Sequence, residues 1–224
     1  MWMLRITLMS LALLSAPLLA QPGDSTAGLV GRVEGRMYIS PTGMFRVPIP
    51  VLPELGGSLT DTPNVVTFQD NFNVNISIGV FTQDASQRWE LSTRGLKDYL
   101  GYFLGTFMMP DFQSAFPGCR IESAIFSPST MGGALIAYTL LPGGSMFENK
   151  RTILGAAETP AVAKRGNMIF VHNGAIIVIT TELAERVTER TSYKRTTAEE
   201  DQLLRDRLVD LAKKIEWVRP AATP

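Results

Sequence analysis

The chain has 224 residues, of which 45% are hydrophobic and 19% charged. These values are typical of a globular protein with one ordinary domain. Lysine plus arginine and aspartate plus glutamate number 21 each, so the formal net charge is +0 and no overall basic excess favours a nucleic-acid partner. The single cysteine excludes an intramolecular disulfide, and the single histidine excludes a metal site built from several histidines.

The first 20 residues have the pattern of a secretory signal peptide. One cation, Arg5, precedes an apolar run, and small residues lead to Ala20, after which we expect cleavage. The run from Ile6 to Leu19 is interrupted by two serines and a proline and is short for a membrane-spanning helix. We therefore expect a mature protein without a transmembrane segment, located in the periplasm or outside the cell.

The sequence after the signal peptide predicts a leader, one domain and a short tail. Residues 21–35 are small, polar and rich in glycine, which is typical of a flexible leader. We expect the domain to cover residues 36–219 and the tail residues 220–224. The domain begins with a predicted hairpin, in which the turn Pro41-Thr42-Gly43 joins two short β-type runs, Met37 to Ser40 and Met44 to Ile49.

Alternating apolar residues predict a strand in the next part of the domain. One face of this strand carries five apolar side chains and the other face, with Asn73, Asn75, Ser77 and Gly79, meets water or a polar layer. The apolar five are Phe72, Val74, Ile76, Ile78 and Val80. The run Val65 to Gln69 precedes this strand, and Asp70-Asn71 between them predicts an antiparallel hairpin.

A long helix is expected after this hairpin. No proline lies between Ser86 and Met109, and apolar residues recur at helical spacing up to Pro110, which we expect to end the helix. These residues are Trp89, Leu96, Leu100, Phe103 and Phe107.

The opposite side of the same helix is also apolar, which makes it the candidate site of this sequence. It carries Tyr99, Tyr102, Met108, Met109 and, just beyond the helix, Phe112. A helix that is apolar all round has to be covered twice. We favour a position in the core, and the alternative is an exposed patch or cavity wall for a partner or an apolar ligand.

The second half of the chain predicts further hairpins and a closing helix. The runs Arg120 to Phe126 and Ala134 to Leu141 form one pair, and Arg151 to Gly155 is a possible strand. Asn173-Gly174, after His172, predicts a tight primed turn between Asn167 to Val171 and Ala175 to Thr181. The second of these strands is continuously apolar, which indicates cover on both faces.

The closing helix is expected to start with a capping box. Thr197 is followed three residues later by Glu200, which is the pattern of such a box. Leu204, Leu208, Leu211 and Ile215 then repeat at helical spacing, so this helix packs one narrow side on the sheet.

The order of these elements predicts an α+β domain with a largely antiparallel sheet of about six strands packed by helices on its faces. The segment YISPTGMFRVPIP, from Tyr38 to Pro50, resembles the opening of PsbP-like domains, and the resemblance covers about residues 33 to 219. It implies an αβα sandwich. Family members include lumenal accessory or assembly subunits of photosystem complexes and binders of a small GTPase, while exported bacterial relatives are largely uncharacterised.

The resemblance carries over no catalytic residue, because the matching positions, such as Pro41 and Gly43, shape a hairpin. The charged leader and partner-specific loops of photosynthetic members are not recognisable here, so a photosynthetic role is not supported.

The residues themselves offer little for catalysis. His172, the one histidine, stands at a predicted hairpin end, and no Gly-x-Ser-x-Gly elbow or phosphate-binding loop is present. Cys119 is interpreted as an inert cysteine at a strand start, with a reactive thiol beside Arg120 or intermolecular pairing as alternatives.

The sequence therefore predicts a non-catalytic binding protein without a cofactor or metal, acting as an accessory or assembly factor for another envelope protein. Two alternatives stay open. One is a small-ligand or lipid carrier with an apolar cavity near Tyr99, Tyr102, Met109 and Phe112. The other is an enzyme that uses carboxylates or Cys119.

Overall fold

The computed structural model describes residues 28–144, 162–189 and 192–218. The predicted signal peptide, the possible strand from Arg151 to Gly155 and the tail lie outside these residues. Within them, no helix has the length and apolar character needed to cross a membrane.

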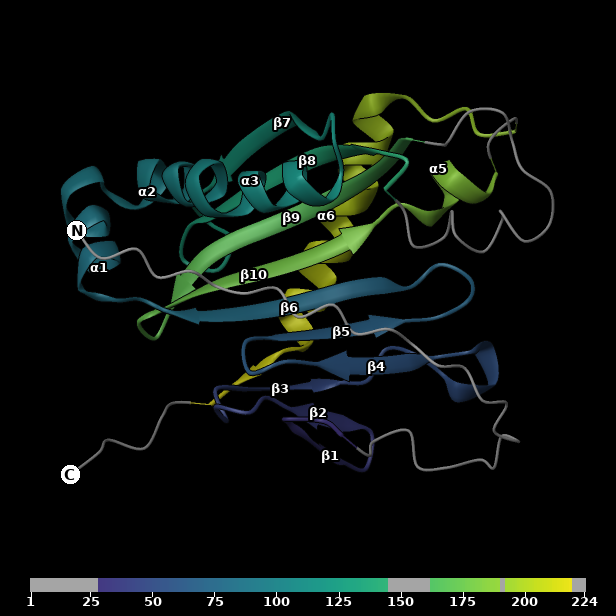
Figure 1. Cartoon of the computed structure of the whole chain (residues 1–224), viewed down its shortest axis with the longest axis horizontal. Coiled ribbons are helices and arrows are strands. Elements are labelled where there is room, and N and C mark those ends of the chain that lie inside the picture. The colour runs from purple at the N-terminus through teal and green to yellow at the C-terminus, as the bar shows by residue number, and fades with distance from the viewer. Residues whose placement is uncertain (1–27, 145–161, 190–191, 219–224) are drawn as a thin grey trace, which may run out of the picture.

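Two antiparallel sheets form the frame of the domain (Figure 1). The larger sheet has the strand order β4-β5-β6-β10-β9-β8-β7 and the smaller one β1-β2-β3-β11. Their bounds are β1 Arg32–Glu34, β2 Met37–Ile39, β3 Phe45–Pro48, β4 Ser58–Asp61, β5 Val65–Gln69, β6 Asn75–Thr82, β7 Arg120–Ser127, β8 Ala134–Pro142, β9 Val162–His172, β10 Ala175–Glu182 and β11 Glu216–Trp217.

The α+β class and the antiparallel sheet are thus confirmed, with a main sheet of seven strands and a second sheet of four. Strand β4, which the sequence pattern did not indicate, adds one edge to the main sheet. The predicted first hairpin, β2 and β3, forms the smaller sheet with β1 and β11. Strand β1 lies within the range 21–35 that predicts a leader, so regular structure begins before Arg36.

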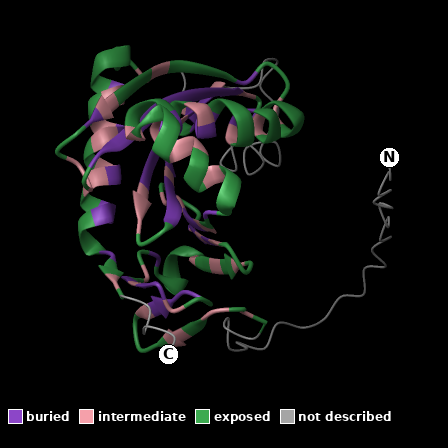
Figure 2. Ribbon diagram, turned by 90° about the vertical axis from the view of Figure 1, so that its left-hand side faces the viewer, coloured by how far each residue is buried: buried purple, intermediate pink, exposed green. Residues whose placement is uncertain are grey.

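Helices cover the two faces of the main sheet (Figures 1 and 2). On one face lie α1 Ala85–Arg94, α2 Leu96–Phe103, the π-helical turn η2 Leu104–Met108, α3 Met109–Ala115 and α5 Ala184–Thr188. On the other face lie α6 Thr197–Lys214 and the smaller sheet. A short 3₁₀ turn, η1 Pro53–Leu55, connects the smaller sheet to β4. Each face has its own apolar core, because β8, β9 and β10 are buried from both sides.

The two sheets share the apolar core on the α6 face, and the carboxylate of Asp61 in β4 links them in addition. Its Oδ2 accepts hydrogen bonds from the Tyr38 hydroxyl at 2.7 Å and from the Gly31 amide at 2.7 Å, and its Oδ1 accepts one from the Val30 amide at 2.9 Å. Burial by itself would raise the pKa of Asp61, but these three bonds together lower it below its ordinary value. The carboxylate therefore stays ionised and fixes the approach to β1.

Strand β6 begins later than its alternating pattern predicts. The Asp70 carboxylate accepts hydrogen bonds from the amides of Phe72, Asn73 and Val74, at 2.8 to 2.9 Å, and this turn delays the extended backbone to Asn75. Phe72 consequently does not share the apolar face and is 57% exposed. Ile78 and Val80 do face the core, as predicted.

The prediction of a single helix from Ser86 to Met109 is wrong, because the helix is broken at Gly95. This residue has a φ of 77° and a ψ of 163°, which only glycine adopts easily, and it separates α1 from α2. The break changes the phase of the apolar stripe, so Trp89 lies on α1 with 62% of its surface exposed.

Pro110 does not end the helix, which is a second correction to the same prediction. The Met109 amide donates to the Leu104 carbonyl, five residues back, and α3 continues through Pro110 to Ala115. Since proline has no amide hydrogen and its ring crowds the preceding turn, a wide π turn before it accommodates both constraints.

The capping box of α6 is shifted by one residue from the predicted pair. Thr196 is the N-cap, its hydroxyl accepts a hydrogen bond from the Glu199 amide, and the Glu199 carboxylate accepts one from the Thr196 amide at 2.7 Å. Glu200 has a different role, because it is buried under α6 with 1% of its surface exposed.

A buried ion cluster fastens the start of α6 to the sheet. The Lys164 ammonium, fully buried, lies 3.0 Å from Glu200 Oε2 and 2.6 Å from Asp201 Oδ1, and it also pairs with Glu122. Arg186 of α5 pairs with the same Glu200. Burial would lower the pKa of Lys164, but its hydrogen bonds to these three carboxylates raise it above the ordinary value.

The turn between β9 and β10 is the one predicted. Asn173 and Gly174 have φ angles of 48° and 73°, as a primed turn requires. The strands pair from His172 with Ala175 to Arg165 with Glu182, which sets the register of the sheet centre.

Candidate functional site

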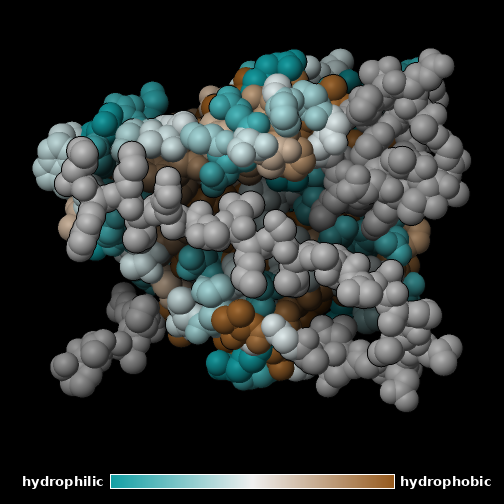
Figure 3. Space-filling model, viewed as in Figure 1, coloured by the Kyte–Doolittle hydropathy of each residue, from teal (hydrophilic) through white to brown (hydrophobic). Residues whose placement is uncertain are grey.

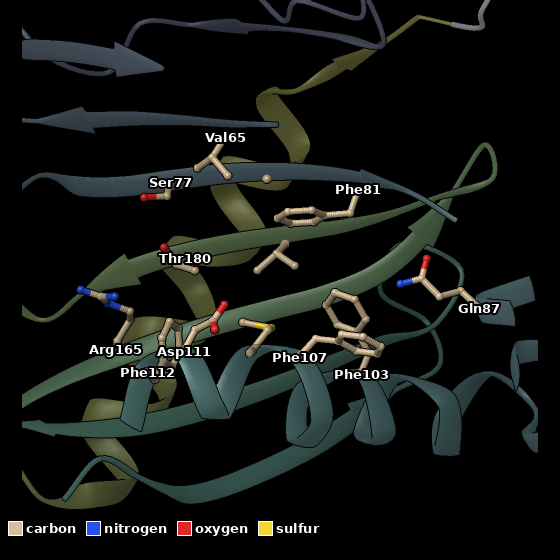
Figure 4. Close-up of a pocket in the computed structure, with 13 residues that line it drawn as sticks. Val65, Ser77, Phe81, Gln87, Phe103, Phe107, Asp111, Phe112, Arg165 and Thr180 are labelled. Atoms are coloured by element: carbon tan, nitrogen blue, oxygen red, sulfur yellow. The ribbon is translucent and has the colours of Figure 1, made fainter. Parts of the chain in front are cut away.

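A pocket of about 470 Å³ lies between the main sheet and the helices α1, α2 and α3 (Figure 4). It has the size that small-molecule sites usually have. Its floor is the sheet and its roof is the helical layer, so the lining comes from segments far apart in the sequence. The lining residues are Val65, Ser77, Gly79, Phe81, Gln87, Phe103, Phe107, Met108, Asp111, Phe112, Arg165, Val178 and Thr180.

The floor of the pocket is hollow because β6 has a glycine at its centre. Val65 of β5 is paired with Gly79, and Val178 of β10 is paired with Gly79 from the other side. A Cβ atom at Gly79 would lie 2.7 Å from Cε2 of Phe81, so any side chain here would push that ring. The absence of a side chain at this point leaves the room that the pocket occupies.

The roof takes its shape from the π turn. The extra residue of η2 rotates α3 relative to α2 by about 100°, so Met108 and Phe112 line the pocket while Met109 turns into the core. Phe103 and Phe107 pack on each other with ring centroids 5.3 Å apart, and Phe103 also lies 6.4 Å from Phe81. Three aromatic rings therefore gather at one end of the pocket.

The other end of the pocket is polar, as Figure 4 shows. Ser77 and Thr180 are directly paired across β6 and β10, and their hydroxyls lie on the pocket side of the sheet. Arg165 of β9 and Asp111 of α3 complete this end. The predicted polar face of β6 is thus part of a site.

Two of the five predicted patch residues, Met108 and Phe112, line the pocket. Tyr99 and Met109 belong to the core, with 0% and 7% exposure, and the Tyr99 hydroxyl accepts a hydrogen bond from Gln83 at 3.0 Å. Tyr102 is half-buried, with the Arg94 guanidinium 4.4 Å from its ring centre.

Cys119 and His172, which were considered for catalysis, do not line this pocket, whereas one carboxylate, that of Asp111, does. Cys119 is buried with 4% exposure, and burial raises the pKa of its thiol despite the opposing charge of Arg165. His172 ends β9 with its ring 4.7 Å from that of Trp217, and burial lowers its pKa. In the described part of the chain, no group of histidine, cysteine, aspartate and glutamate side chains is arranged for a metal ion.

A wider hollow, about 800 Å³, lies on the α6 side of the sheet. Its walls carry mixed charges, including Arg36, Asp210 and Lys214. Because its lining has no comparable group of aromatic rings and its charges are of both signs, the pocket between sheet and helices is the better candidate for a specific ligand.

No family model matches this chain, and no curated protein matches it by sequence. Its structure is similar to the solution structure of cyanobacterial PsbP (CyanoP) from Synechocystis sp. PCC 6803, with 13% identity and a TM-score of 0.47, over 84% of this chain and 99% of that chain. A crystal structure from Bacteroides thetaiotaomicron VPI-5482 is similar as well, with 11% identity and a TM-score of 0.44, over 84% of this chain and 50% of that chain.

The chain therefore spans half the length of the Bacteroides protein. The predicted likeness to PsbP-like domains is confirmed as a structural match to CyanoP, and it concerns the fold alone.

Proposed function

We propose that this chain is an exported protein that acts by binding, and that the pocket between the sheet and α1–α3 holds a small apolar molecule. The observation that carries the proposal is the pocket of about 470 Å³ whose one end is formed by Phe81, Phe103 and Phe107. Aromatic and aliphatic walls with a few polar groups are typical of ligand sites. The N-terminal sequence pattern supports export.

The same lining argues against catalysis at this site. Asp111 and Arg165 are its only ionisable groups among the lining residues, and Cys119 and His172 do not line it. Acid–base or nucleophilic catalysis needs a nucleophile and a base within hydrogen-bond reach of each other. The lining offers no such pair, so holding a ligand is the activity that it supports best.

A fluorescence titration tests the proposal. The chain beginning at Gln21 is titrated with N-phenyl-1-naphthylamine, a neutral apolar probe, and saturable binding is expected. In the variant Gly79→Val the new side chain fills the floor and displaces Phe81, so the affinity should fall at least about tenfold, the effect of losing about 1.4 kcal/mol.

The matched control for this titration is Thr82→Val, which places the same side chain at an exposed position of the same strand, outside the pocket. It should bind the probe like the unchanged protein. Absence of saturable binding, or equal affinity in folded Gly79→Val, would contradict the proposal.

An exposed apolar patch favours a second candidate, an accessory factor that contacts another envelope protein. Leu52, Leu55 and Phe72 are 39%, 40% and 57% exposed, and the hydrogen bond from the Asn71 amide to the Leu55 carbonyl, 3.1 Å, brings the two segments together. Elsewhere, on the face that Figure 3 presents, small apolar areas lie among hydrophilic residues over the smaller sheet. Contiguous apolar surface often marks a protein contact.

This second candidate predicts one crosslinked partner in envelope extracts. The partner should be lost with Phe72→Ser and retained with Trp89→Ser, which removes a similarly exposed apolar residue on α1. Loss or retention in both variants alike would rule out a contact through this patch.

A further inference from the structure

We infer that the ligand of this pocket is an amphipathic molecule with an anionic head group, such as a carboxylate, and that Arg165 binds the head. The inference rests on the proposed function and specifies the class of ligand. It follows from the way in which polar and apolar residues are distributed along the pocket, and from the state of the Arg165 guanidinium.

The floor of the pocket changes from apolar to polar along the strands. On β10, Ile176 and Val178 belong to the apolar core beneath the helices, while Thr180 lines the polar end and Glu182 follows it on the same face. Strand β6 runs antiparallel and changes in the same direction, from Phe81 to Ser77. The Ser77 hydroxyl already shares a hydrogen bond with the Thr67 hydroxyl, at 3.1 Å. A uniformly apolar ligand would still cover the Thr180 hydroxyl and the Arg165 guanidinium without offering them a partner, whereas an amphipathic one satisfies both ends.

Arg165 is partly removed from water by the aromatic rings beside it. Its Cζ lies 5.7 Å from the ring centre of Phe112 and 6.0 Å from that of Phe116, and its side chain is 19% exposed. A guanidinium in such surroundings gains more from an anionic partner than one in bulk water does.

One edge of this guanidinium is already held. Arg165 Nη2 lies 3.1 Å from Oε2 of the buried Glu182, and that oxygen also accepts a hydrogen bond from Asn75 Nδ2 at 3.1 Å. A guanidinium has five N–H donors in a fixed plane, so one bond to Glu182 fixes its orientation and leaves donors for a second carboxylate. Glu182 is thus a positioning residue, and Arg165 faces the pocket.

Asp111 opposes an anion, and this makes the sign of the ligand charge testable. Its carboxylate lines the same end of the pocket from the first turn of α3, where it is exposed. Glu182 already offsets the charge of Arg165, so an anionic head is held by the guanidinium donors that Glu182 leaves rather than by an excess of positive charge. The exposed Asp111 charge is screened by water and opposes the head only weakly. Removing the Asp111 charge should therefore strengthen the binding of an anion and weaken that of a cation.

The test compares three probes that share a ten-carbon chain and differ in the head. Decanoate, 1-decanol and decyltrimethylammonium compete with N-phenyl-1-naphthylamine for the mature protein, and decanoate should bind most tightly. In Arg165→Gln the dissociation constant of decanoate should rise at least about tenfold, as expected for a lost charge-assisted hydrogen bond, while that of 1-decanol changes less than about twofold.

The variant Asp111→Asn replaces an exposed side chain by one of equal size. It should therefore fold, and it tests the sign of the ligand charge even if Arg165→Gln does not fold. It should lower the dissociation constant of decanoate about two- to fivefold and not that of 1-decanol, as is usual for one screened charge. Equal affinity for decanoate and 1-decanol, or tightest binding of decyltrimethylammonium together with its loss in Asp111→Asn, overturns the inference. If the naphthylamine probe itself does not bind, the proposed function fails; if it binds and Gly79→Val blocks it, only the head-group assignment is at stake.

Discussion

Two neighbouring residues of β9, Lys164 and Arg165, show how the two faces of the main sheet differ. Lys164 points under α6, where it is fully buried and paired with three carboxylates. Arg165 points to the opposite face, where one carboxylate holds it and the rest of its guanidinium borders the pocket. A strand alternates its side chains between faces, so one step along the chain separates a cation used to hold the fold from a cation open to a ligand.

The two faces therefore differ in packing: the α6 face is closely packed, and the opposite face contains the pocket. On the α6 face, Leu204 and Leu208 are fully buried, and a Cβ at Gly166 would lie 3.1 Å from Leu208, so helix and sheet are in close contact. On the other face, the missing side chain at Gly79 and the π turn η2 leave a pocket between the sheet and the helices. We expect substitutions on the first face to change stability, and substitutions around the pocket to change binding.

The largest effect is expected from breaking the buried ion cluster. Lys164→Ala leaves buried carboxylates without their cation and should lower the free energy of unfolding by about 3–5 kcal/mol at neutral pH, measured by urea denaturation. Lys213→Ala is the control. This lysine of α6 forms an exposed pair with Asp210, so its removal should change the free energy of unfolding little.

The same substitution has a pH signature whose sign follows from the raised pKa of Lys164. A group with a raised pKa stabilises the fold fully below its unfolded value, about 10.4 for lysine, and loses that contribution as the pH rises through the folded value. The difference in the free energy of unfolding between the unchanged protein and Lys164→Ala should therefore be constant near neutral pH and become smaller in alkaline solution. A difference that grows in alkaline solution would contradict the raised pKa of Lys164.

Intermediate losses of stability are expected from two substitutions that compare the packed core with the pocket wall. Leu208→Ala removes a fully buried side chain and should cost about 2–5 kcal/mol of stability. Phe107→Ala removes a larger side chain that is 41% exposed and lines the pocket, and should cost less, about 1–2 kcal/mol, while weakening the binding of the naphthylamine probe. Equal losses of stability would mean that the two faces are packed alike.

The smallest effect tests the start of α6. Thr196→Ala removes the N-cap hydroxyl and should lower the midpoint of thermal unfolding by an amount equivalent to about 1 kcal/mol. Thr197→Ala changes the neighbouring threonine, which lies inside the helix, and should leave the midpoint nearly unchanged. If Thr197→Ala has the larger effect, the capping box begins at Thr197, as the sequence pattern suggested.

Local signals in the sequence predicted those parts of the fold that depend on nearby residues. Asn173-Gly174 defines its own turn, and the continuous apolar run from Ala175 indicates a strand covered on both faces. The shift from Thr197 to Thr196 shows the limit of such signals. Both threonines have an acid three residues on, and the choice depends on Glu200 being buried against Lys164, 36 residues away.

The candidate site was only partly predictable for the same reason. Met108 and Phe112 were visible as an excess of apolar residues on a helix, but the phase change at Gly95 and the π turn decide that Tyr99 and Met109 turn into the core. Arg165 was missed because the predicted strand begins at Asn167, whereas β9 already begins at Val162 and carries Lys164 and Arg165 into the sheet. Gly79 was missed because a glycine in a strand shows its importance only when its neighbours are known.

The π turn η2 makes the wall of the pocket depend on a single amino acid. A π turn holds one residue more than the α-helical path, so deleting one, for example Thr106, would turn α3 back by about 100° and place Pro110 after an α-helical turn that its ring crowds. Phe112 and Asp111 would then leave the cavity and other side chains would replace them. The length of this turn thus decides which side chains line the pocket above an unchanged sheet.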